Sequence, residues 1–301
     1  MIKKCLPAAL LGLVAATPAF SIEIENVTKA SSFVEDTGSI ERISSAEKLR
    51  TYSQEVAAAS CFLYNDIDPA LSAELVLEAR VGFDRHLSAL LNGDDTLGII
   101  GGERRRKTIA KLESIQKDWT KLAVSIDALL ENPKDDAAIA AIKAANLPLF
   151  GKTDILVSEL EGQYSDPAVL MQVDVIMLEI VGRQAMMTQK IAKNACKIWT
   201  GNDQQQIKDD LAKSMDIYEA SLNALLNGMP ELGIRPAPTR EIETKLTTVL
   251  TAWKGVRPKF ETLLAGAEIP VESQGKLFKH MIEEMKLLEE VTDHYVTFAK
   301  H

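Results

Sequence analysis

Aromatic residues are scarce in this 301-residue sequence, at 5% of the chain, and there are only three cysteines. Strands favour aromatic and β-branched residues, so this shortage, with abundant alanine, leucine, lysine, glutamate and glutamine, favours helices over sheets. Basic residues are outnumbered by acidic ones, 34 to 43, which gives a net charge of −9. A chain of this charge binds nucleic acids and anionic membranes poorly, so we expect neither as a partner.

Long apolar runs are missing after residue 21, where no stretch approaches the roughly 20 apolar residues that a membrane-spanning helix needs. The first 21 residues combine Lys3 and Lys4 with an apolar run and a small-residue exit, the pattern of a secretory signal. We therefore expect residues 1–21 to be a signal peptide and the mature protein to be exported, which means periplasmic in a Gram-negative bacterium. Residues 22–38 are polar and aperiodic, and we expect a flexible lead-in there.

The usual motifs of catalysis and metal binding are missing as well. No glycine-rich phosphate loop follows a strand pattern, and no nucleophile motif such as G-x-S-x-G occurs. The four histidines show no metal-ligand spacing with one another or with the cysteines. We therefore expect no enzymatic activity, no metal site and no cofactor.

One 18-residue stretch is present twice, 135 residues apart. Residues 46–63 read AEKLRTYSQEVAAASCFL, and residues 181–198 read VGRQAMMTQKIAKNACKI. The repeat continues beyond this stretch, because LSALLNG at 87–93 returns as LNALLNG at 222–228. The chain is therefore an internal duplication.

Apolar residues recur at spacings of 3, 4 and 7, which is typical of helices with one buried face. We expect four helices in each copy, which include 40–64, 69–91, 103–131 and 135–163 in the first copy, and 166–199 and 271–299 in the second. Pro148 predicts a kink or a break in the fourth helix. An all-α fold of two tandem antiparallel four-helix bundles fits best, with units at 39–164 and 165–301. A stacked helical repeat fits less well, because such arrays need three or more units.

On a helical wheel, the first helix of each copy carries a second stripe nearly opposite the apolar face that packs into its bundle core. The stripe consists of Arg50, Gln54, Ala57 and Cys61 in the first copy and of Ala185, Gln189, Ala192 and Cys196 in the second. We expect the two stripes to meet about a pseudo-two-fold axis; the alternative is that their similarity is residual duplication. After export, an even pair of cysteines favours a disulfide between Cys61 and Cys196 over two free thiols.

The repeated stretch resembles a known family. Residues 182–193, GRQAMMTQKIAK, are similar to the A-G-R-Q-R-M-L-S-Q-R-M-A-K signature of the PilJ-type domain, the N-terminal domain of type IV pilus methyl-accepting chemotaxis transducers. Residues 46–54, AEKLRTYSQ, carry a weaker form of the signature. The resemblance implies an exported four-helix sensor whose first helix meets its partner's first helix, and a relation to the sensor domain of nitrate/nitrite histidine kinases.

The resemblance also implies a ligand site, because in the nitrate-sensing relatives an arginine from each first helix holds the anion. The matching position is Arg50 in the first copy and Ala185 in the second, so a symmetric arginine pair is not available. Arg50 with a neighbouring cation can still hold a planar anion; alternatively, Arg50 is solvated or paired with an acidic residue. The candidate ligand residues are Arg50, Arg183, Lys48, Gln54, Gln189 and Lys190.

These observations predict an exported sensory or ligand-binding module, for a small anion such as nitrate or nitrite, that passes its signal to a separate envelope protein. The alternative is an accessory or structural protein of the cell envelope or of the type IV pilus chemosensory system that binds no small ligand; Ala185 favours this alternative. Because the duplication supplies internally the pairing that single-copy relatives obtain by dimerising, we expect a monomer.

Overall fold

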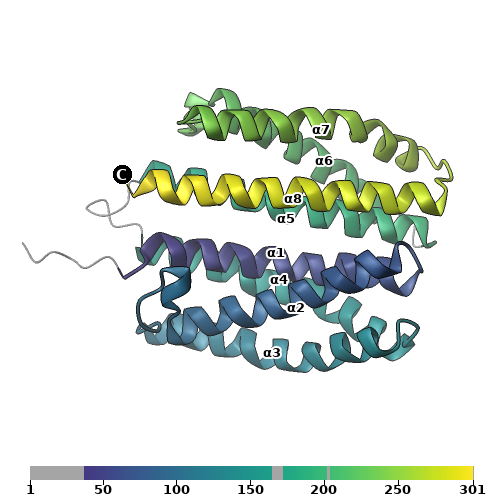
Figure 1. Ribbon diagram of the computed structural model, residues 1–301, viewed down its shortest axis with the longest axis horizontal. Coiled ribbons are helices and arrows are strands. Elements are labelled where there is room, and N and C mark those ends of the chain that lie inside the picture. The colour runs from purple at the N-terminus through teal and green to yellow at the C-terminus, as the bar shows by residue number, and fades with distance from the viewer. Residues whose placement is uncertain (1–36, 165–171, 202–203, 301) are drawn as a thin grey trace, which may run out of the picture. The chain divides into compact units, whose positions relative to one another are not determined.

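The computed structural model describes residues 37–164, 172–201 and 204–300, which form eight α-helices (Figure 1). In chain order these are α1 (Ser39–Tyr64), α2 (Pro69–Asn92), α3 (Arg106–Glu131), α4 (Asp136–Tyr164), α5 (Gln172–Trp199), α6 (Gln205–Asn227), α7 (Arg240–Leu264) and α8 (Val271–Ala299). Within the described ranges there is no strand beyond two isolated bridges. The expected signal peptide and nearly all of the expected lead-in lie outside the described residues.

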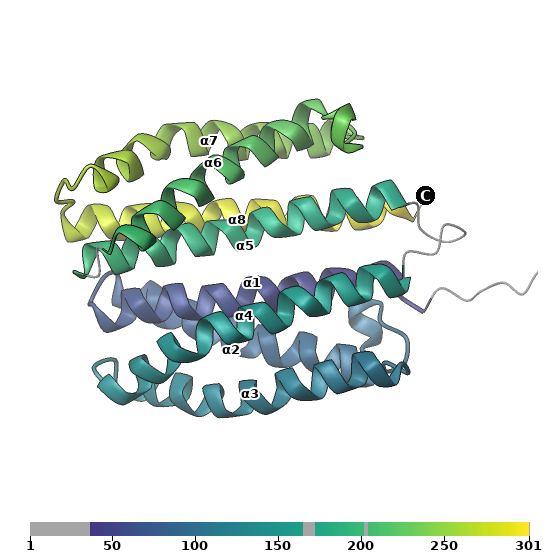
Figure 2. The same cartoon turned by 180° about the vertical axis from the view of Figure 1, so that it is seen from behind.

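The helices form two four-helix bundles, and the predicted all-α fold is confirmed. In the first bundle α1 packs against α2 and α4, and α3 closes the ring against the same two helices. In the second bundle α5 packs against α6 and α8, and α7 contacts both of these. Figures 1 and 2 show α1 and α4 of the first bundle facing α5 and α8 of the second, and the most extensive contact between the bundles is that of α1 with α5. Residues 165–171, where we expect the boundary between the units, lie outside the described residues.

The core of each bundle repeats a tryptophan hydrogen-bonded to an acidic side chain. Trp119 donates its indole N–H to Asp84 Oδ1 at 2.6 Å, and Trp253 donates to Glu219 Oε2 at 3.1 Å. Both indoles are at most 2% exposed, so each N–H needs a protein acceptor. The duplication thus preserves a packing unit together with the hydrogen bond that makes its burial possible.

The connection after the second helix of each copy also keeps its conformation. Asp94 and Ile99 form an isolated antiparallel bridge, and so do Met229 and Ile234. Each bridge encloses a short 3-10 helix that ends at a left-handed glycine, with φ of 72° at Gly98 and 71° at Gly233. A side chain in this region of φ is strained, which explains a glycine at the same place in both copies.

Two expected helix features differ from the structure. Helix α4 continues through Pro148 as one element, so the expected break into two pieces is wrong. Helix α3 begins at Arg106 instead of residue 103, because the Glu103 carboxylate accepts the backbone N–H groups of Arg104 and Arg105. None of the described helices is long and apolar enough to cross a bilayer.

Helix α1 is the most enclosed element of the fold, since α2, α4, α5 and α8 all contact it. Nineteen of its 26 residues are buried, and they include charged and amide side chains such as Glu47, Arg50 and Gln54. Buried polar side chains need partners, so the partners of these residues identify the chemistry of the contact with α5.

Candidate functional site

Helices α1 and α5 lie side by side and run in the same direction. Near their N-termini, Glu47 Oε2 lies 2.8 Å from the point that a Cβ on Gly182 would occupy. Near their C-termini, Cys61 meets Cys196. Both pairs join residues 135 apart, which are equivalent positions of the two copies. The contact, here called the α1–α5 seam, is therefore arranged about a pseudo-two-fold axis that runs along the helices.

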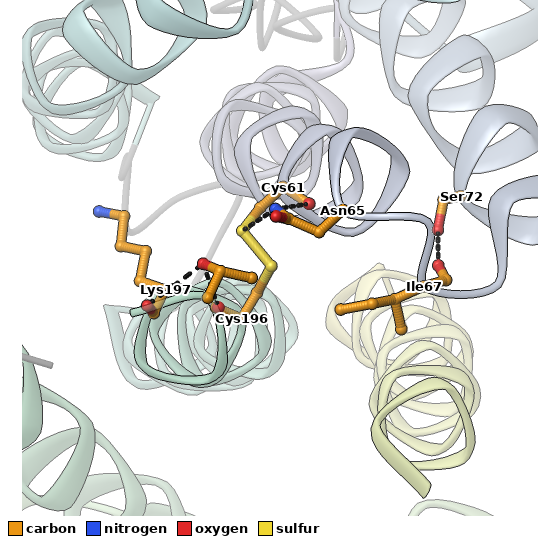
Figure 3. Close-up of a disulfide and its surroundings, with 7 residues drawn as sticks. Cys61, Asn65, Ile67, Ser72, Cys196 and Lys197 are labelled. Carbon is orange, nitrogen blue, oxygen red and sulfur yellow. Dashed lines mark hydrogen bonds between the residues drawn. A yellow bond between two sulfur atoms is a disulfide. The ribbon is translucent and has the colours of Figure 1, made fainter. Parts of the chain in front are cut away.

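A disulfide between Cys61 and Cys196 joins the two helices, with 6.3 Å between the Cα atoms (Figure 3). Both cysteines are at most 3% exposed. Asn65 donates its side-chain N–H to the Cys61 carbonyl at 2.8 Å, and Thr200 donates its hydroxyl to the Cys196 carbonyl at 2.9 Å. The C-terminal end of the seam is thus covalently fixed.

The Arg50 side chain is fully buried and is bound by carboxylates. Its guanidinium donates to Asp154 Oδ1 at 2.9 Å and to Glu47 Oε2, and Glu179 Oε1 lies 3.7 Å away. Burial opposes its charge, but Glu47 and the other carboxylates together raise the pKa of Arg50 above its ordinary value. The cation is therefore already paired on α1, α4 and α5.

Four carboxylates and two arginines make up this group, which we call the Arg50 cluster: Glu47, Arg50, Asp154, Glu161, Glu179 and Arg183. Burial, together with the charges of Glu179 and Glu161, raises the pKa of Glu47 to about 8 against the opposing effect of Arg50. Burial, with the charge of Glu179, raises the pKa of Glu161 to about 7. Burial thus favours the neutral form of these carboxyls, whereas Arg50 and Arg183 favour the ionised form.

Three oxygens of the cluster can approach a metal ion, because one from each of Glu47, Glu161 and Glu179 lies within 4.8 Å of the others. Arg50 and Arg183 already supply positive charge at these carboxylates. We therefore assign the cluster no metal.

Toward the C-terminal half of the seam a pocket of about 560 Å³ opens between α1, α4, α5 and α6. Its lining contains five lysines, and we call it the lysine pocket. The lining residues are Gln54, Lys143, Asn146, Leu147, Phe150, Lys190, Lys193, Asn194, Lys197, Gln206, Ile207, Asp209, Asp210 and Lys213.

Lys193 is the most deeply placed cation of the lysine pocket, with 8% of its surface exposed. Its ammonium donates to Gln54 Oε1 at 2.5 Å and to Asn146 Oδ1 at 2.9 Å. Burial, together with the charges of Lys197 and Lys190, lowers the pKa of Lys193 to about 7. Among the described residues, the ammonium thus has neutral amide partners and no carboxylate in direct contact.

The six residues predicted for a ligand do not form one site. Arg50 and Arg183 belong to the Arg50 cluster, whereas Gln54 and Lys190 line the lysine pocket. Gln189 is buried and donates to Thr188 Oγ1 at 3.1 Å.

The remaining predicted residue, Lys48, pairs with Glu289 of α8 at 2.7 Å. Lys48 and Glu289 stand at positions equivalent to Arg183 and Asp154, which approach to 3.9 Å. Each copy thus sends one cation from its first helix to an acid on the fourth helix of the other copy. Lys48 is a bridge between bundles on the side away from the lysine pocket.

Sequence reasoning missed several residues of the site, for different reasons. Lys193 lies four residues after Gln189, beside the stripe and inside the repeated motif, so its position was a usable signal. Asn146 and Asp154 lie on α4, about 90 to 100 residues from their α1 partners, and nothing local indicates those contacts.

A comparison with known protein families finds a match to this chain. The family model described as "Type IV pili methyl-accepting chemotaxis transducer N-term", PilJ, matches residues 31–145 and 176–275, which is more than half of the chain. A comparison with curated proteins finds no match. The two matched segments take in α1 and most of α5, the helices that form the seam. The chain belongs to the PilJ family of type IV pilus chemotaxis transducer N-terminal domains.

Proposed function

We propose that the chain is a periplasmic sensory module in which a small anion changes the α1–α5 seam, and that a separate envelope protein detects this change. One observation carries the proposal: the seam buries ionisable groups where a close-packed core would hold apolar ones. Buried charges contribute little net stability, so such a contact is easily biased by a ligand that interacts with it. We expect no catalytic activity.

The anion is proposed to enter on the side of the lysine pocket. Of the predicted ligand residues, Gln54 and Lys190 lie there, together with four further lysines. Arg50 and Arg183 suit an anion less well, because the carboxylates of the Arg50 cluster would repel it. The internal pairing of α1 with α5 supports a monomer, since each first helix already has its partner within the chain.

A second function is favoured by Arg50 itself. Its guanidinium is occupied by Glu47 and Asp154, and its counterpart is Ala185, so the arginine pair of a nitrate sensor is replaced by an internal ion-pair network. On this reading the chain is an accessory or structural envelope protein that binds a partner and no small ligand.

Thermal unfolding of the oxidised mature protein, measured with nitrate, nitrite, sulfate and small carboxylates, separates the two functions. A sensory module is stabilised by its ligand, by roughly 2.7 kcal/mol at a ligand concentration 100 times Kd. Sodium chloride at equal ionic strength is the control for screening. No specific stabilisation by any anion would support the accessory function and contradict the sensory one.

A further inference from the structure

The pseudo-two-fold axis gives the α1–α5 seam two equivalent flanks. One flank is covered by α4 and α6, which enclose the lysine pocket, and the other by α8 and α2. Residues 135 apart are equivalent on the two flanks, because α1 and α5, α2 and α6, and α4 and α8 all end 135 residues apart. The flanks can therefore be compared position by position.

On the second flank, beneath α8 and α2, buried side chains occupy positions whose equivalents line the pocket on the first flank. Phe62 and Phe278 stack there, with ring centroids 3.8 Å apart, and both are at most 1% exposed. Their equivalents on the first flank are Lys197 and Lys143, which line the pocket. The fully buried Met281 likewise stands where the first flank has an amide side chain of the pocket. The same backbone arrangement thus buries Phe62, Phe278 and Met281 on one flank, where Glu55 stands in place of Lys190, and opens around lysines on the other.

We propose that the lysine pocket is a binding site for a small organic dianion of the dicarboxylate class. The proposal rests on the proposed sensory function, because it names the ligand of that function. The stacked phenylalanines of the second flank show that this architecture can bury apolar side chains at the positions of Lys197 and Lys143, so packing does not require lysines there.

The charge of the pocket matches a dianion. Five lysines and two aspartates line it, which gives a net charge of +3, or +2 when Lys193 is neutral. Lys190 is partly balanced by Asp210 at 2.7 Å, so the unbalanced charge lies with the other lysines. The first turn of α6, the positive end of a 23-residue helix, also faces the pocket through Gln206 and Ile207.

The size and walls of the pocket point to an organic ligand. A volume of about 560 Å³ falls within the range of small-molecule sites, roughly 300 to 1,000 Å³. Leu147, Phe150 and Ile207 provide apolar surface for a carbon skeleton, and ammonium and amide groups provide donors for carboxylates. Nitrate or sulfate would leave the apolar wall without a contact.

Binding should take up a proton. Lys193 faces neutral amides, and burial lowers its pKa to about 7, so a bound carboxylate would raise that pKa again. The other charged groups that line the pocket are Lys143, Lys190, Lys197, Lys213, Asp209 and Asp210. Affinity is therefore greatest below pH 7 and falls as the pH rises above the pKa of the free form.

Titration calorimetry with succinate on the oxidised full chain tests the site. The triple variant Lys143→Ala, Lys197→Ala, Lys213→Ala removes three lysines of the pocket and should weaken succinate binding about tenfold or more. The control triple variant Lys117→Ala, Lys254→Ala, Lys259→Ala removes the same charge from α3 and α7 and should change the affinity by less than about twofold. Circular dichroism establishes that both variants fold.

The outcomes separate this site from the sensory function. Succinate binding that both triple variants weaken equally, or tighter binding of nitrate or sulfate than of succinate, would overturn the dicarboxylate site while an anion sensor remained. Succinate binding that is lost only in the pocket variant, with no effect on the seam, would support the site and contradict the sensory function. Absence of succinate binding at pH 6.5 overturns the site.

Discussion

The two flanks of the α1–α5 seam descend from one ancestral surface, and they now have opposite character. The flank beneath α8 holds the stacked Phe62 and Phe278, whereas the flank beneath α4 holds buried Lys193 and a lysine-lined pocket. Duplication within one chain removed the constraint that both flanks be identical, a constraint that a symmetric dimer of single copies retains. One flank can therefore provide packing and the other recognition.

The same division holds along the seam. Cys61 and Cys196 are identical at equivalent positions, and they bond to each other. Glu47 and Gly182 are also equivalent, yet they are complementary, because the glycine leaves room for the carboxylate. Residues on the axis thus either pair with their counterpart or make space for it.

The largest effect on stability should come from removing the Cys61–Cys196 disulfide at the C-terminal end of the seam. The disulfide closes a loop of 135 residues, and the chain-entropy model gives about 5 kcal/mol for such a loop. We expect Cys61→Ala with Cys196→Ala to lower the free energy of unfolding by up to that amount, measured by denaturant titration. A reducing agent should act on the wild type alone. Equal stability of the wild type and the double variant would show that the link contributes nothing.

At the N-terminal end of the seam, Glu47 should make the free energy of unfolding depend on pH. Glu47 has a pKa of about 8 in the folded chain and an ordinary value of 4.5, so its contribution to stability is fully present below pH 4.5 and is lost as the pH rises through 8. Relative to the wild type, Glu47→Gln should gain up to about 4 kcal/mol between pH 4.5 and pH 8. Chemical denaturation at several pH values measures this difference; a constant offset between the two proteins would contradict the raised pKa.

A methyl group at Gly182 tests whether the Glu47 side chain needs the space that this glycine leaves. The Cβ of Gly182→Ala would lie 2.8 Å from Glu47 Oε2 and 2.9 Å from its Cδ, and we expect a loss of about 1 to 3 kcal/mol. Gly162→Ala on the exposed face of α4 is the matched control, because its Cβ meets nothing within 4 Å. That change should stabilise the helix by about 0.4 to 1 kcal/mol. Equal responses would mean that Glu47 gives way freely.

The smallest effects on stability should come from the tryptophan–acid hydrogen bond that both copies keep. Asp84→Ala and Glu219→Ala each remove the acceptor of a buried indole N–H, which costs about 1 to 3 kcal/mol. We expect similar losses in thermal or chemical unfolding, because each acid also pairs with an arginine, Asp84 with Arg80 and Glu219 with Arg257. A loss confined to one copy would show that the two cores have diverged in energy as well as in sequence.

Much of the fold could be predicted because helical periodicity and repetition are local signals. The last helix, expected at 271–299, has those bounds, and the first begins one residue earlier than expected. Of the kink or break expected at Pro148, the break is wrong, because whether a proline breaks a helix depends on the packing around it; the kink stays a prediction.

The site was less predictable, because its character depends on which helices flank the seam. Glu47, three residues before Arg50, was visible as a possible partner, but Asp154 is 104 residues away. The wheel placed Gln54 and Gln189 on one stripe and could not show that Lys193 would donate to Gln54 and to Asn146 of α4. The asymmetry of the flanks arises from α4 and α8, whose sequences have diverged too far to align by a motif.

Amide hydrogen exchange of the oxidised protein, with and without saturating succinate, tests most directly whether the seam responds to a ligand in its pocket. We predict slower exchange in peptides from the C-terminal halves of α1 and α5 and unchanged exchange in α3 and α7, which lie away from the seam. Unchanged exchange in α1 and α5 at saturation would contradict the account, because a ligand without an effect on the seam leaves the partner protein nothing to detect.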